Sequence, residues 1–341
     1  MKKIIFIVNS LKHRSGVERV VSLLANELSQ YYAIEIINRN TSFNQCAYPL
    51  NGNVKVKVIS GKLPTFFFSV KKYLSMIKPD VIIIHNMGKL SLLMSLLPRK
   101  YNLWSYEHVS RVSRPKWINW LGKNLYKRFD KIITLTYEDK IEYEKLAFNI
   151  DVVFNPSPYE LVDNYNVVSK SIIAAGRLTH QKGFDLLIRA WDLIANKYPD
   201  WRLDIYGEGI DKQKLKDQID IANINNIHLL GSSNDMEHVY KNASFYVMSS
   251  RYEGLPMVLI EAQTFALPIV SFNCPYGPKE IITNDEDGIL VENGNIQQLA
   301  ASIESLILSE SKRITMSKKA IESAKRFSKK NIITEWRRLL K

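Results

Sequence analysis

The chain has few of the residues that build disulfide-bonded or zinc-binding domains. Only two of its 341 residues are cysteines, Cys46 and Cys274, and neither belongs to a CxxC or Cys/His spacing. We therefore expect neither a disulfide framework nor a zinc site, and we expect the protein to reside in the reducing cytoplasm. Nowhere do 18 apolar residues follow one another, so we expect no transmembrane helix. The apolar run in MKKIIFIVNSL ends at Asn9 and Ser10, too early for a signal peptide, and predicts a first strand.

Negative charge is scarce in two segments. Residues 99–131 hold nine lysines and arginines against two acids, a net charge of +7, and residues 312–341 hold eleven against two, a net charge of +9. Together these +16 charges exceed the +13 of the whole chain, so the basic excess is local. A local excess indicates a surface that meets an anionic partner, either phospholipid head groups or nucleic acid. No nucleic-acid-binding motif is recognisable, which favours the membrane and predicts no nucleic-acid partner.

Short β-branched runs alternate with segments of helical period along the whole chain. The runs expected to form strands are KIIFIV, DVIIIH, KIITLT, SIIAAG, RLDIYG and SFYVMS. Such alternation predicts an α/β protein with parallel sheets built from βαβ units. It occurs twice, in residues 2–154 and again from residue 171, so we expect two domains. Residues 155–170 are polar and interrupted by proline, and form the expected linker.

The loops that follow the expected strands carry candidate ligand-binding residues, because open parallel sheets bind ligands at the carboxyl ends of their strands. Arg177 and Lys182 lie in the loop after SIIAAG, where a fork of donors and a point charge suit a diphosphate. Gly16 opens the first helix and Gly207 ends the RLDIYG run, so a phosphate, sugar or base could approach the backbone at either position. The alternative is structural, with solvated loop charges and ordinary turn glycines.

The stretch RYEGLPMVLIEA, residues 251–262, has one acid in front of Gly-Leu-Pro and another inside an apolar run. We expect Glu253 on a loop, Pro256 at the first position of the next helix, and Glu261 about 7–8 Å further along that helix. Free N–H groups around Gly254 and Leu255 would face an anion between the two acids. Each carboxylate can accept hydrogen bonds from hydroxyls, so the spacing suits a sugar, a diphosphate and a ribose in a row.

The acidic residues also have structural interpretations. Glu253 could pair with Arg251 at the surface and Glu261 could cap or salt-bridge elsewhere, although its apolar neighbours make that less attractive. The DED sequence at residues 285–287 matches a metal-binding D-x-D pattern, but it lies in a polar turn that ends in glycine. We therefore expect a turn there, and no essential metal or other cofactor.

RYEGLPMVLIEA resembles the E-x7-E motif of retaining glycosyltransferases with the GT-B fold, family four, which includes many bacterial polysaccharide and lipid-glycan enzymes. AAGRLTHQKGFDLLIRAW is similar to the diphosphate segment of that family, YGEG to its base-side loop, and PIVSFNCPYGPKEII with DGILV to its downstream helix and strand. The resemblance implies two Rossmann-like doubly wound domains facing a cleft. Residues 1–160 would bind the acceptor and 171–325 the nucleotide-sugar donor, and 326–341 would form a helix returning to the N-terminal domain.

The resemblance also implies roles for individual residues. Arg177 and Lys182 would hold the donor diphosphate, Glu253 the transferred sugar, Glu261 the ribose, Gly207 the base side, Gly254 and Leu255 the phosphates, Gly16 the donor or acceptor, and His108 the donor sugar from the N-terminal domain. Without the family context, His108 is a histidine near Glu107 and Arg111 with a structural or surface role. Retention of configuration is implied by the resemblance alone, and no covalent nucleophile is assigned.

The segment KWINWLGKNLYKR, residues 116–128, predicts a basic amphipathic helix. The apolar side holds Trp117, Ile118, Leu121 and Leu125, the flank holds Lys116, Lys123 and Lys127, and Trp120 adds a second tryptophan. A basic helix with tryptophans suits an anchor on an anionic membrane surface. The alternative packs its apolar side on the core of the N-terminal domain.

These patterns lead to one functional hypothesis. We expect a glycosyltransferase that moves a hexose or N-acetylhexosamine from a nucleotide sugar, UDP-linked in our interpretation, to a hydroxyl of a membrane-linked glycan in cell-surface polysaccharide biosynthesis. Its expected location is cytoplasmic, on the inner face of the cytoplasmic membrane. The alternatives are a GT-B-fold nucleotide-sugar epimerase, a noncatalytic sugar-nucleotide binder and, suggested only by charge, a nucleic-acid-binding protein.

Overall fold

The computed structural model describes residues 1–13, 15–39, 41–86, 88–111, 114–146 and 149–341. The chain divides into two compact units. The N-terminal unit comprises residues 1–156 together with 332–341, and the C-terminal unit comprises residues 157–331. Each unit has its own parallel sheet and its own hydrophobic core.

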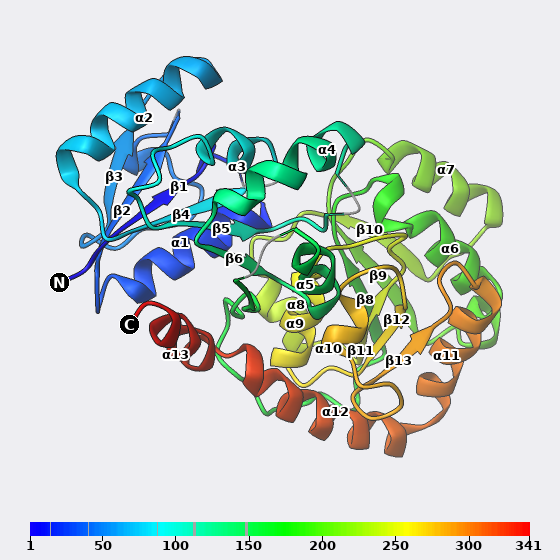
Figure 1. Ribbon diagram of the computed structural model, residues 1–341. Coiled ribbons are helices and arrows are strands. Elements are labelled where there is room, and N and C mark those ends of the chain that lie inside the picture. Colours follow the sequence, from blue (N-terminus) through cyan, green and yellow to red (C-terminus); the bar gives the residue numbers. More distant parts are fainter. Residues whose placement is uncertain (14, 40, 87, 112–113, 147–148) are drawn as a thin grey trace. The chain divides into compact units, whose positions relative to one another are not determined.

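The sheet of the N-terminal unit is parallel throughout, with the strand order β3-β2-β1-β4-β5-β6-β7 (Figure 1). Its strands are β1 (Lys3–Ile7), β2 (Ala33–Asn38), β3 (Lys55–Val58), β4 (Val81–Asn86), β5 (Leu103–Glu107), β6 (Lys131–Thr134) and β7 (Ile150–Val152). The central strands are buried on both faces, which explains why they are continuous β-branched runs rather than alternating ones.

Helices cover both faces of this sheet. They are α1 (Gly16–Leu28), α2 (Leu63–Ile77), α3 (Lys89–Met94), α4 (Lys116–Leu125), α5 (Tyr137–Glu144) and α13 (Lys329–Leu339), with short 3-10 turns η1 (Phe43–Gln45) and η2 (Tyr126–Arg128). In Figure 1, α2, α3 and α4 lie along one side of the sheet, and α1 and α13 along the other.

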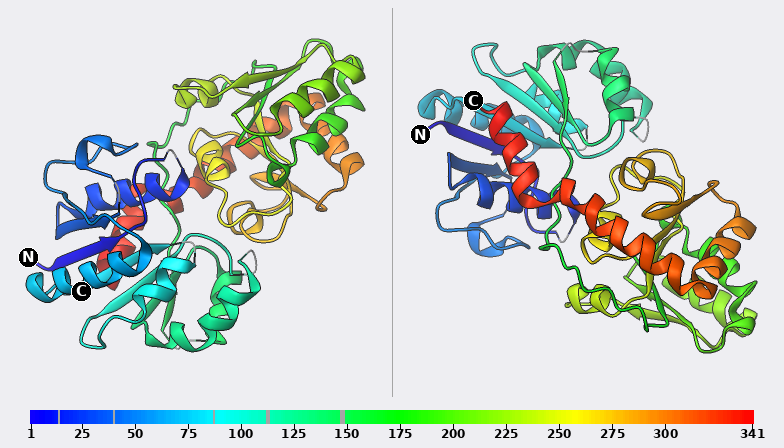
Figure 2. Two further views of the ribbon diagram at one scale, coloured as in Figure 1. Left: turned by 90° about the horizontal axis from the view of Figure 1, so that it is seen from above. Right: turned by 90° about the horizontal axis from the view of Figure 1, so that it is seen from below.

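The last ten residues of the chain pack on the N-terminal unit (Figure 2). The buried Trp336 ring meets the Tyr106 ring edge-on with centroids 5.2 Å apart, and Lys2 Nζ donates to the carbonyl of Leu340 at 2.9 Å. The helix α13 begins at Lys329, and only its part from Ile332 onward belongs to this unit. The chain therefore returns to the N-terminal unit within α13 rather than at residue 326.

The C-terminal unit repeats the same plan with the strand order β10-β9-β8-β11-β12-β13, again parallel. Its strands are β8 (Ser171–Ala175), β9 (Arg202–Tyr206), β10 (Ile227–Gly231), β11 (Phe245–Met248), β12 (Ile269–Phe272) and β13 (Gly288–Val291). Its helices are α6 (Phe184–Asp192), α7 (Lys212–Ala222), α8 (Met236–Lys241), α9 (Met257–Thr264), α10 (Pro278–Ile281), α11 (Ile296–Leu308) and α12 (Glu310–Ala324), with 3-10 turns η3 (His180–Lys182), η4 (Ala195–Lys197) and η5 (Lys325–Phe327).

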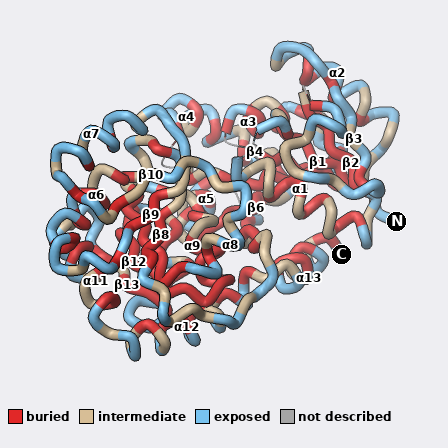
Figure 3. The backbone as a smooth tube through the Cα atoms, turned by 180° about the vertical axis from the view of Figure 1, so that it is seen from behind, coloured by how far each residue is buried: buried red, intermediate tan, exposed pale blue. Residues whose placement is uncertain are grey.

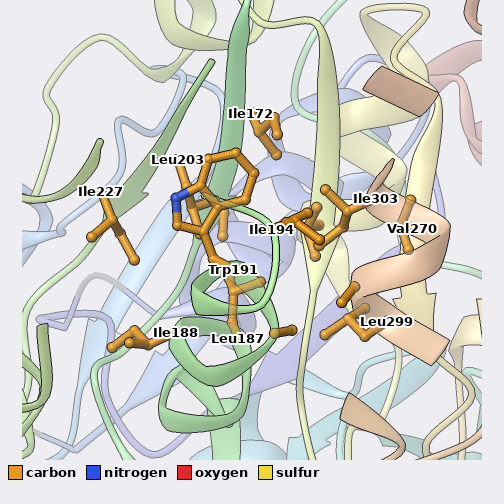
Figure 4. Close-up of a cluster of buried hydrophobic side chains, with 14 of the residues drawn as sticks. Ile172, Leu187, Ile188, Trp191, Ile194, Leu203, Ile227, Val270, Leu299 and Ile303 are labelled. Carbon is orange, nitrogen blue, oxygen red and sulfur yellow. The ribbon is translucent and has the colours of Figure 1, made fainter. Parts of the chain in front are cut away.

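The core of the C-terminal unit is centred on Trp191 of α6, whose ring lies fully buried among aliphatic side chains (Figure 4). The tube coloured by burial shows the same arrangement, with buried strands between helices that expose their outer faces (Figure 3). Residues 157–170 are hydrogen-bonded to this unit, for example through Val162 N–H to Thr264 O at 2.9 Å and Tyr165 Oη to Ser244 O at 2.7 Å. Residues 157–170 form an extended segment that is part of the C-terminal unit, residues 157–160 included.

The predicted α/β class with two doubly wound parallel sheets is confirmed. All six strand runs expected from the sequence are strands in the structure. In each sheet the strand order reverses at one point, between β1 and β4 and between β8 and β11. Ligands of open α/β sheets bind outside the carboxyl ends of the strands at such a switch point, so these loops are the first places to look for a site.

Candidate functional site

The predicted donor-site residues of the C-terminal unit lie in the two loops at its switch point. Arg177 and Lys182 follow β8, while Glu253, Gly254 and Leu255 follow β11. The loops are joined directly: Ser249 Oγ donates to Lys182 O at 3.1 Å, and Arg251 N–H donates to Gln181 O at 2.8 Å. Residues 67 and 70 positions apart in sequence are thereby held in one small region.

Two glycines permit close approach between loops of this unit. A Cβ on Gly183, which has a φ of +65°, would lie 2.0 Å from the carbonyl oxygen of Ser249. A Cβ on Gly207, which has a φ of +148°, would lie 1.9 Å from the carbonyl oxygen of Gly176. Both positions therefore require glycine for packing between loops as well as for their backbone conformation. This structural role accounts for Gly207 independently of any contact with a base.

Lys182 and Glu253 form an ion pair between the two loops. Lys182 Nζ lies 2.6 Å from Glu253 Oε1, and Ser250 Oγ donates to the same oxygen at 2.6 Å. The side chains are only 15% and 7% exposed, so solvent weakens the pair less than it would a surface pair. The structural alternative for Glu253 is wrong, because Arg251 instead forms a bidentate pair with Asp185, at 2.8 and 2.7 Å.

The two loops that hold this ion pair also carry donors that no described residue uses. Arg177 is exposed, and its guanidinium has no hydrogen-bond or ion-pair partner in the described part of the chain. Nor do the backbone N–H groups of Gly254 and Leu255 find acceptors among the described residues. The next helix, α9, begins at Met257, one residue later than expected, because Pro256 has an extended backbone and forms its N-cap. An anion placed here would meet two cations and unpaired N–H groups at a helix N-terminus.

Glu261 is buried on α9 and has a fixed orientation. The hydroxyl of Tyr240 on α8 donates to Glu261 Oε2 at 3.0 Å, and the Tyr240 ring stacks on Phe265 with centroids 5.3 Å apart. Burial, with the charge of Glu261 as a further cause, raises the pKa of Tyr240 well above its usual range, so its hydroxyl stays a donor. Tyr240 was not predicted as a site residue, because HVYK in the sequence indicates only an ordinary helical turn.

Two further residues that the motifs missed lie at the site. The Tyr246 hydroxyl of β11 accepts from the N–H of Ala175 at 2.9 Å and donates to its carbonyl at 3.0 Å, which ties β11 to the end of β8. Burial raises the pKa of the Cys274 thiol to about 12, and the charge of Glu253 contributes to the increase. Cys274 is therefore a neutral side chain beside the ion pair.

His108 lies in the N-terminal unit, directly after β5, and is paired with a second histidine. Its Nε2 lies 3.2 Å from Nδ1 of His85, near the end of the neighbouring strand β4. Burial lowers the pKa of His108 to about 3 and that of His85 well below its usual range, with His108 as a second cause for His85. Both rings are therefore uncharged at pH 7. His85 was missed, although its place at the end of DVIIIH was a usable indication.

The charged neighbours of His108 in the sequence have other partners. Glu107 is buried and forms an ion pair with Arg114, and Arg114 also donates to Val109 O and Tyr126 Oη, both at 2.8 Å. Arg111 pairs with Glu142 at 3.2 Å. Among the described residues, the rings of His85 and Tyr106 lie against His108, and Arg114 bonds to the residues on both sides of it, Glu107 and Val109.

Gly16 is the first residue of α1 and is exposed. A Cβ built there would meet no described atom within 4 Å, so packing within the chain does not demand glycine. Ser15 is the N-cap residue, and its hydroxyl donates to Glu18. The open space at Gly16 is compatible with the predicted approach of a ligand.

The basic helix α4 divides into a buried and an exposed face. Ile118 and Gly122 are buried, and Leu125 packs on the core. The exposed face holds Trp117, Trp120 and Leu121 at 52%, 70% and 38% exposure, with Lys116 and Lys123 also exposed, and exposed Lys127 follows on the 3-10 turn η2. Lys89 Nζ lies 5.7 Å from the centre of the Trp117 ring. The packing alternative therefore holds for part of the expected apolar side, while both tryptophans face outward.

The acidic turn at residues 285–287 makes structural contacts. Asp285 has a φ of +64°, and buried Asp287 accepts from Thr283 N–H at 2.9 Å and Ser323 Oγ at 2.5 Å. No group of three or more His, Cys, Asp or Glu side chains in the described ranges is arranged to hold a metal ion. No helix of the described residues has both the length and the apolar character that a membrane crossing requires.

Known proteins resemble this chain in sequence and fold. Residues 164–324 match the family model for Glycosyl transferases group 1. The amylovoran biosynthesis glycosyltransferase AmsD of Erwinia amylovora is 31% identical, with all of both chains covered. The GalNAc-alpha-(1->4)-GalNAc-alpha-(1->3)-diNAcBac-PP-undecaprenol alpha-1,4-N-acetyl-D-galactosaminyltransferase of Campylobacter jejuni is 26% identical over 100% of this chain and 98% of its own.

The fold is shared with a solved structure. HepE of Anabaena, crystallised in complex with UDP, superposes with a TM-score of 0.84 at 17% identity, covering 100% of this chain and 99% of that one. The expected similarity to GT-B glycosyltransferases is thus confirmed in both sequence and fold. The chain belongs to the group 1 family of glycosyl transferases.

Proposed function

We propose that this glycosyltransferase moves a hexose or N-acetylhexosamine from a UDP-sugar to a hydroxyl of a membrane-linked glycan, with retention of configuration, in the biosynthesis of a bacterial cell-surface polysaccharide. The observation that supports the donor site is the Lys182–Glu253 ion pair between the two switch-point loops, with Arg177, which has no partner among the described residues, in the same loop as Lys182. A cation and a carboxylate held together there can bind the two chemically different parts of a sugar diphosphate.

The donor would lie across these two loops. Arg177, Lys182 and the backbone N–H groups of Gly254 and Leu255 would bind the diphosphate. Glu253 would accept hydrogen bonds from hydroxyls of the sugar, and Glu261, oriented by Tyr240, from those of the ribose. The assignment of UDP as the nucleotide carrier is supported by the presence of UDP in the crystal structure of HepE.

The chemistry follows from that placement. The acceptor hydroxyl oxygen forms a bond to the anomeric carbon while the bond from that carbon to the diphosphate breaks. Negative charge then develops on the departing diphosphate, where Arg177 and Lys182 stabilise it without reorganisation. The hydroxyl proton leaves with the diphosphate or to solvent. In this proposal His108 acts on the donor sugar as a neutral ring, and no side chain forms a covalent intermediate.

The donor site is tested by nucleotide-dependent thermal stability. UDP is expected to raise the melting temperature, because a ligand that binds only the folded state adds about 2.7 kcal/mol at a hundredfold excess over its Kd. Arg177→Ala is expected to weaken UDP binding by about tenfold to a hundredfold, the effect of losing one or two hydrogen bonds to a charged group. Differential scanning fluorimetry across UDP, GDP and ADP measures both effects.

Arg189→Ala on α6 is the matched control, because Arg189 is also exposed. It should leave the UDP effect unchanged. Stabilisation by GDP or ADP but not UDP would contradict the donor assignment, and no stabilisation by any nucleotide would contradict the site. Product analysis with UDP-sugars distinguishes transfer with retention from inversion, epimerisation and simple binding.

We further propose that the exposed face of α4 binds the anionic inner surface of the cytoplasmic membrane and that the acceptor is lipid-linked there. Two exposed tryptophans beside three exposed lysines have the composition of an interfacial anchor. The Campylobacter jejuni relative, whose name includes a PP-undecaprenol acceptor, supports this reading of the acceptor.

The membrane proposal predicts a loss of vesicle binding on substitution of the tryptophans. Trp117→Ser with Trp120→Ser is expected to lower the partition onto phosphatidylglycerol vesicles by at least about tenfold, because burying each large apolar side chain contributes about 1.5–3 kcal/mol. Sedimentation with vesicles measures the partition. Ile221→Ser is the control, since Ile221 is 86% exposed but lies on α7. Equal binding by both variants, or to neutral phosphatidylcholine vesicles, would contradict the proposal.

A further inference from the structure

The pair of buried histidines at the carboxyl edge of the N-terminal sheet has a directional hydrogen bond. We propose that His85 is a positioning residue for His108: the Nδ1–H of His85 donates to Nε2 of His108 and fixes His108 in the tautomer that carries its proton on Nδ1. None of the sequence motifs that carry the resemblance includes residue 85. The catalytic consequence of the proposal rests on the proposed role of His108.

The two rings are held in place by the fold. His85 lies near the end of β4, one of the two strands at the switch point, and His108 follows β5, the strand paired with β4. Their planes are inclined by only 20°, with ring centroids 5.4 Å apart. Phe6 of β1 lies 4.5 Å from the His85 ring, and Tyr106 lies 4.4 Å from the His108 ring. This aromatic packing leaves little freedom to either imidazole.

The direction of the hydrogen bond follows from the surroundings of Nε2, the second ring nitrogen of His85. Both rings are neutral, so each carries one proton, and the nitrogens 3.2 Å apart must include one N–H and one lone pair. His85 Nε2 is buried and finds no partner among the described residues. A proton there would be an orphaned buried N–H, which proteins avoid more strictly than an unpaired acceptor. The proton of His85 therefore belongs on Nδ1.

This tautomer gives His108 one defined hydrogen-bond donor, its Nδ1–H group. With Nε2 accepting from His85, its proton is on Nδ1, and this N–H has no acceptor in the described parts of the chain. A neutral N–H held in one orientation can donate to a hydroxyl or ring oxygen of a bound sugar. It would do so without change across the physiological pH range, because neither ring titrates there.

Nuclear magnetic resonance of the full chain with 15N-labelled histidine tests the tautomer directly. The protein has six histidines, so His108→Asn and His85→Asn assign the two sets of signals. The expected result is protonated Nδ1 in both rings at pH 7. A proton on Nε2 of His108, or a positive charge on either ring, would overturn the proposal. This measurement needs no activity, so it is independent of the proposed function.

Kinetics of three substitutions test the positioning role. The amide nitrogen of asparagine can take the place of Nδ1, that of glutamine the place of Nε2, and phenylalanine fills the space without a donor. His85→Asn is expected to retain most of kcat, while His85→Gln and His85→Phe lower it by about tenfold to a hundredfold, as loss of partners that orient metal-bound histidines does. The stabilisation by UDP should be unchanged in all three.

His238→Phe on α8 is the control for a general effect, because His238 is exposed. Melting temperatures of all variants identify any that do not fold, and the comparison of asparagine with glutamine is then made between folded proteins. Equal kcat for His85→Asn, His85→Gln and His85→Phe would overturn the positioning role. Absence of transfer by the wild-type protein would instead contradict the proposed function and leave the tautomer measurement intact.

Discussion

Lys182→Met is expected to lower kcat by about a hundredfold to a thousandfold while the protein stays folded. One preorganised donor aimed at developing charge contributes on that scale to catalysis. Methionine is the most specific replacement, because it removes the charge and keeps an unbranched side chain. The Lys182 methylenes pack close to Gly176, where an added Cβ would lie 3.3 Å from them, and methionine preserves that packing. Initial rates with a UDP-sugar, together with the melting temperature, measure the two effects separately. Lys182→Ala should lose at least as much activity.

The partner of Lys182 allows stability and catalysis to be distinguished. Lys182→Met leaves the carboxylate of Glu253, which is 7% exposed, with Ser250 as its remaining hydrogen-bond donor among the described residues, so some stability should be lost. Adding Glu253→Gln removes the unpaired charge and should recover that stability, but not the activity. Lys197→Met, which removes an exposed pair with Glu304, is the control. Substantial transfer by Lys182→Met would contradict the diphosphate assignment.

The sequence was most informative where a single strand or loop determines the structure. The run SIIAAG predicted β8 because β-branched residues buried on both faces form parallel strands, and its position before Arg177 and Lys182 put both cations at the ligand edge. The same reasoning placed Glu253 in the loop after β11. These predictions depend only on local pattern and on the geometry that parallel sheets share.

The choice of partners could not be predicted in this way. Glu253 was given Arg251 as its alternative partner because the two are near in sequence, yet it pairs with Lys182, 71 residues away. Tyr240 and His85 each act through a side chain on another element. The strand end DVIIIH indicated a place for His85, but nothing in the sequence indicated its partner. Which of several nearby polar groups meet depends on the packing of loops against one another, and that packing has no local signature.

Helix α4 shows an intermediate case. The sequence indicated the helical period and the tryptophans of α4, but not which of its apolar residues are buried and which are exposed. Ile118 is turned to the core while Trp117, its neighbour on the expected apolar side, is 52% exposed. A helical wheel gives the relative angles of side chains, but the direction of the core is set by the strands and by α3 beneath the helix.

Arg114→Met is expected to destabilise the N-terminal unit by about 3–5 kcal/mol, the usual cost of removing one partner from a buried ion pair. Arg114 and Glu107 are 2% and 1% exposed, so the remaining carboxylate would be a buried, uncompensated charge. Ser91 and Ser105 also donate to Glu107 and can offset only part of that cost. In a calorimetric scan the transition of this unit should fall by roughly 6–20 °C.

A less buried pair separates this effect from a general effect of removing arginine. Arg111→Met breaks the contact with Glu142, whose side chain is 27% exposed beside an Arg111 that is 15% exposed. Glu142 keeps its ion pair with Lys145, so the loss should be no more than about 1 kcal/mol. Adding Glu107→Gln to Arg114→Met removes the stranded charge and should recover more than half of the loss, although the bond from Arg114 to Val109 O stays broken. Equal stability of Arg114→Met and Arg111→Met would contradict the view that the buried ion pair holds the chain around His108. A loss of activity in Arg114→Met could then not be attributed to displacement of that histidine.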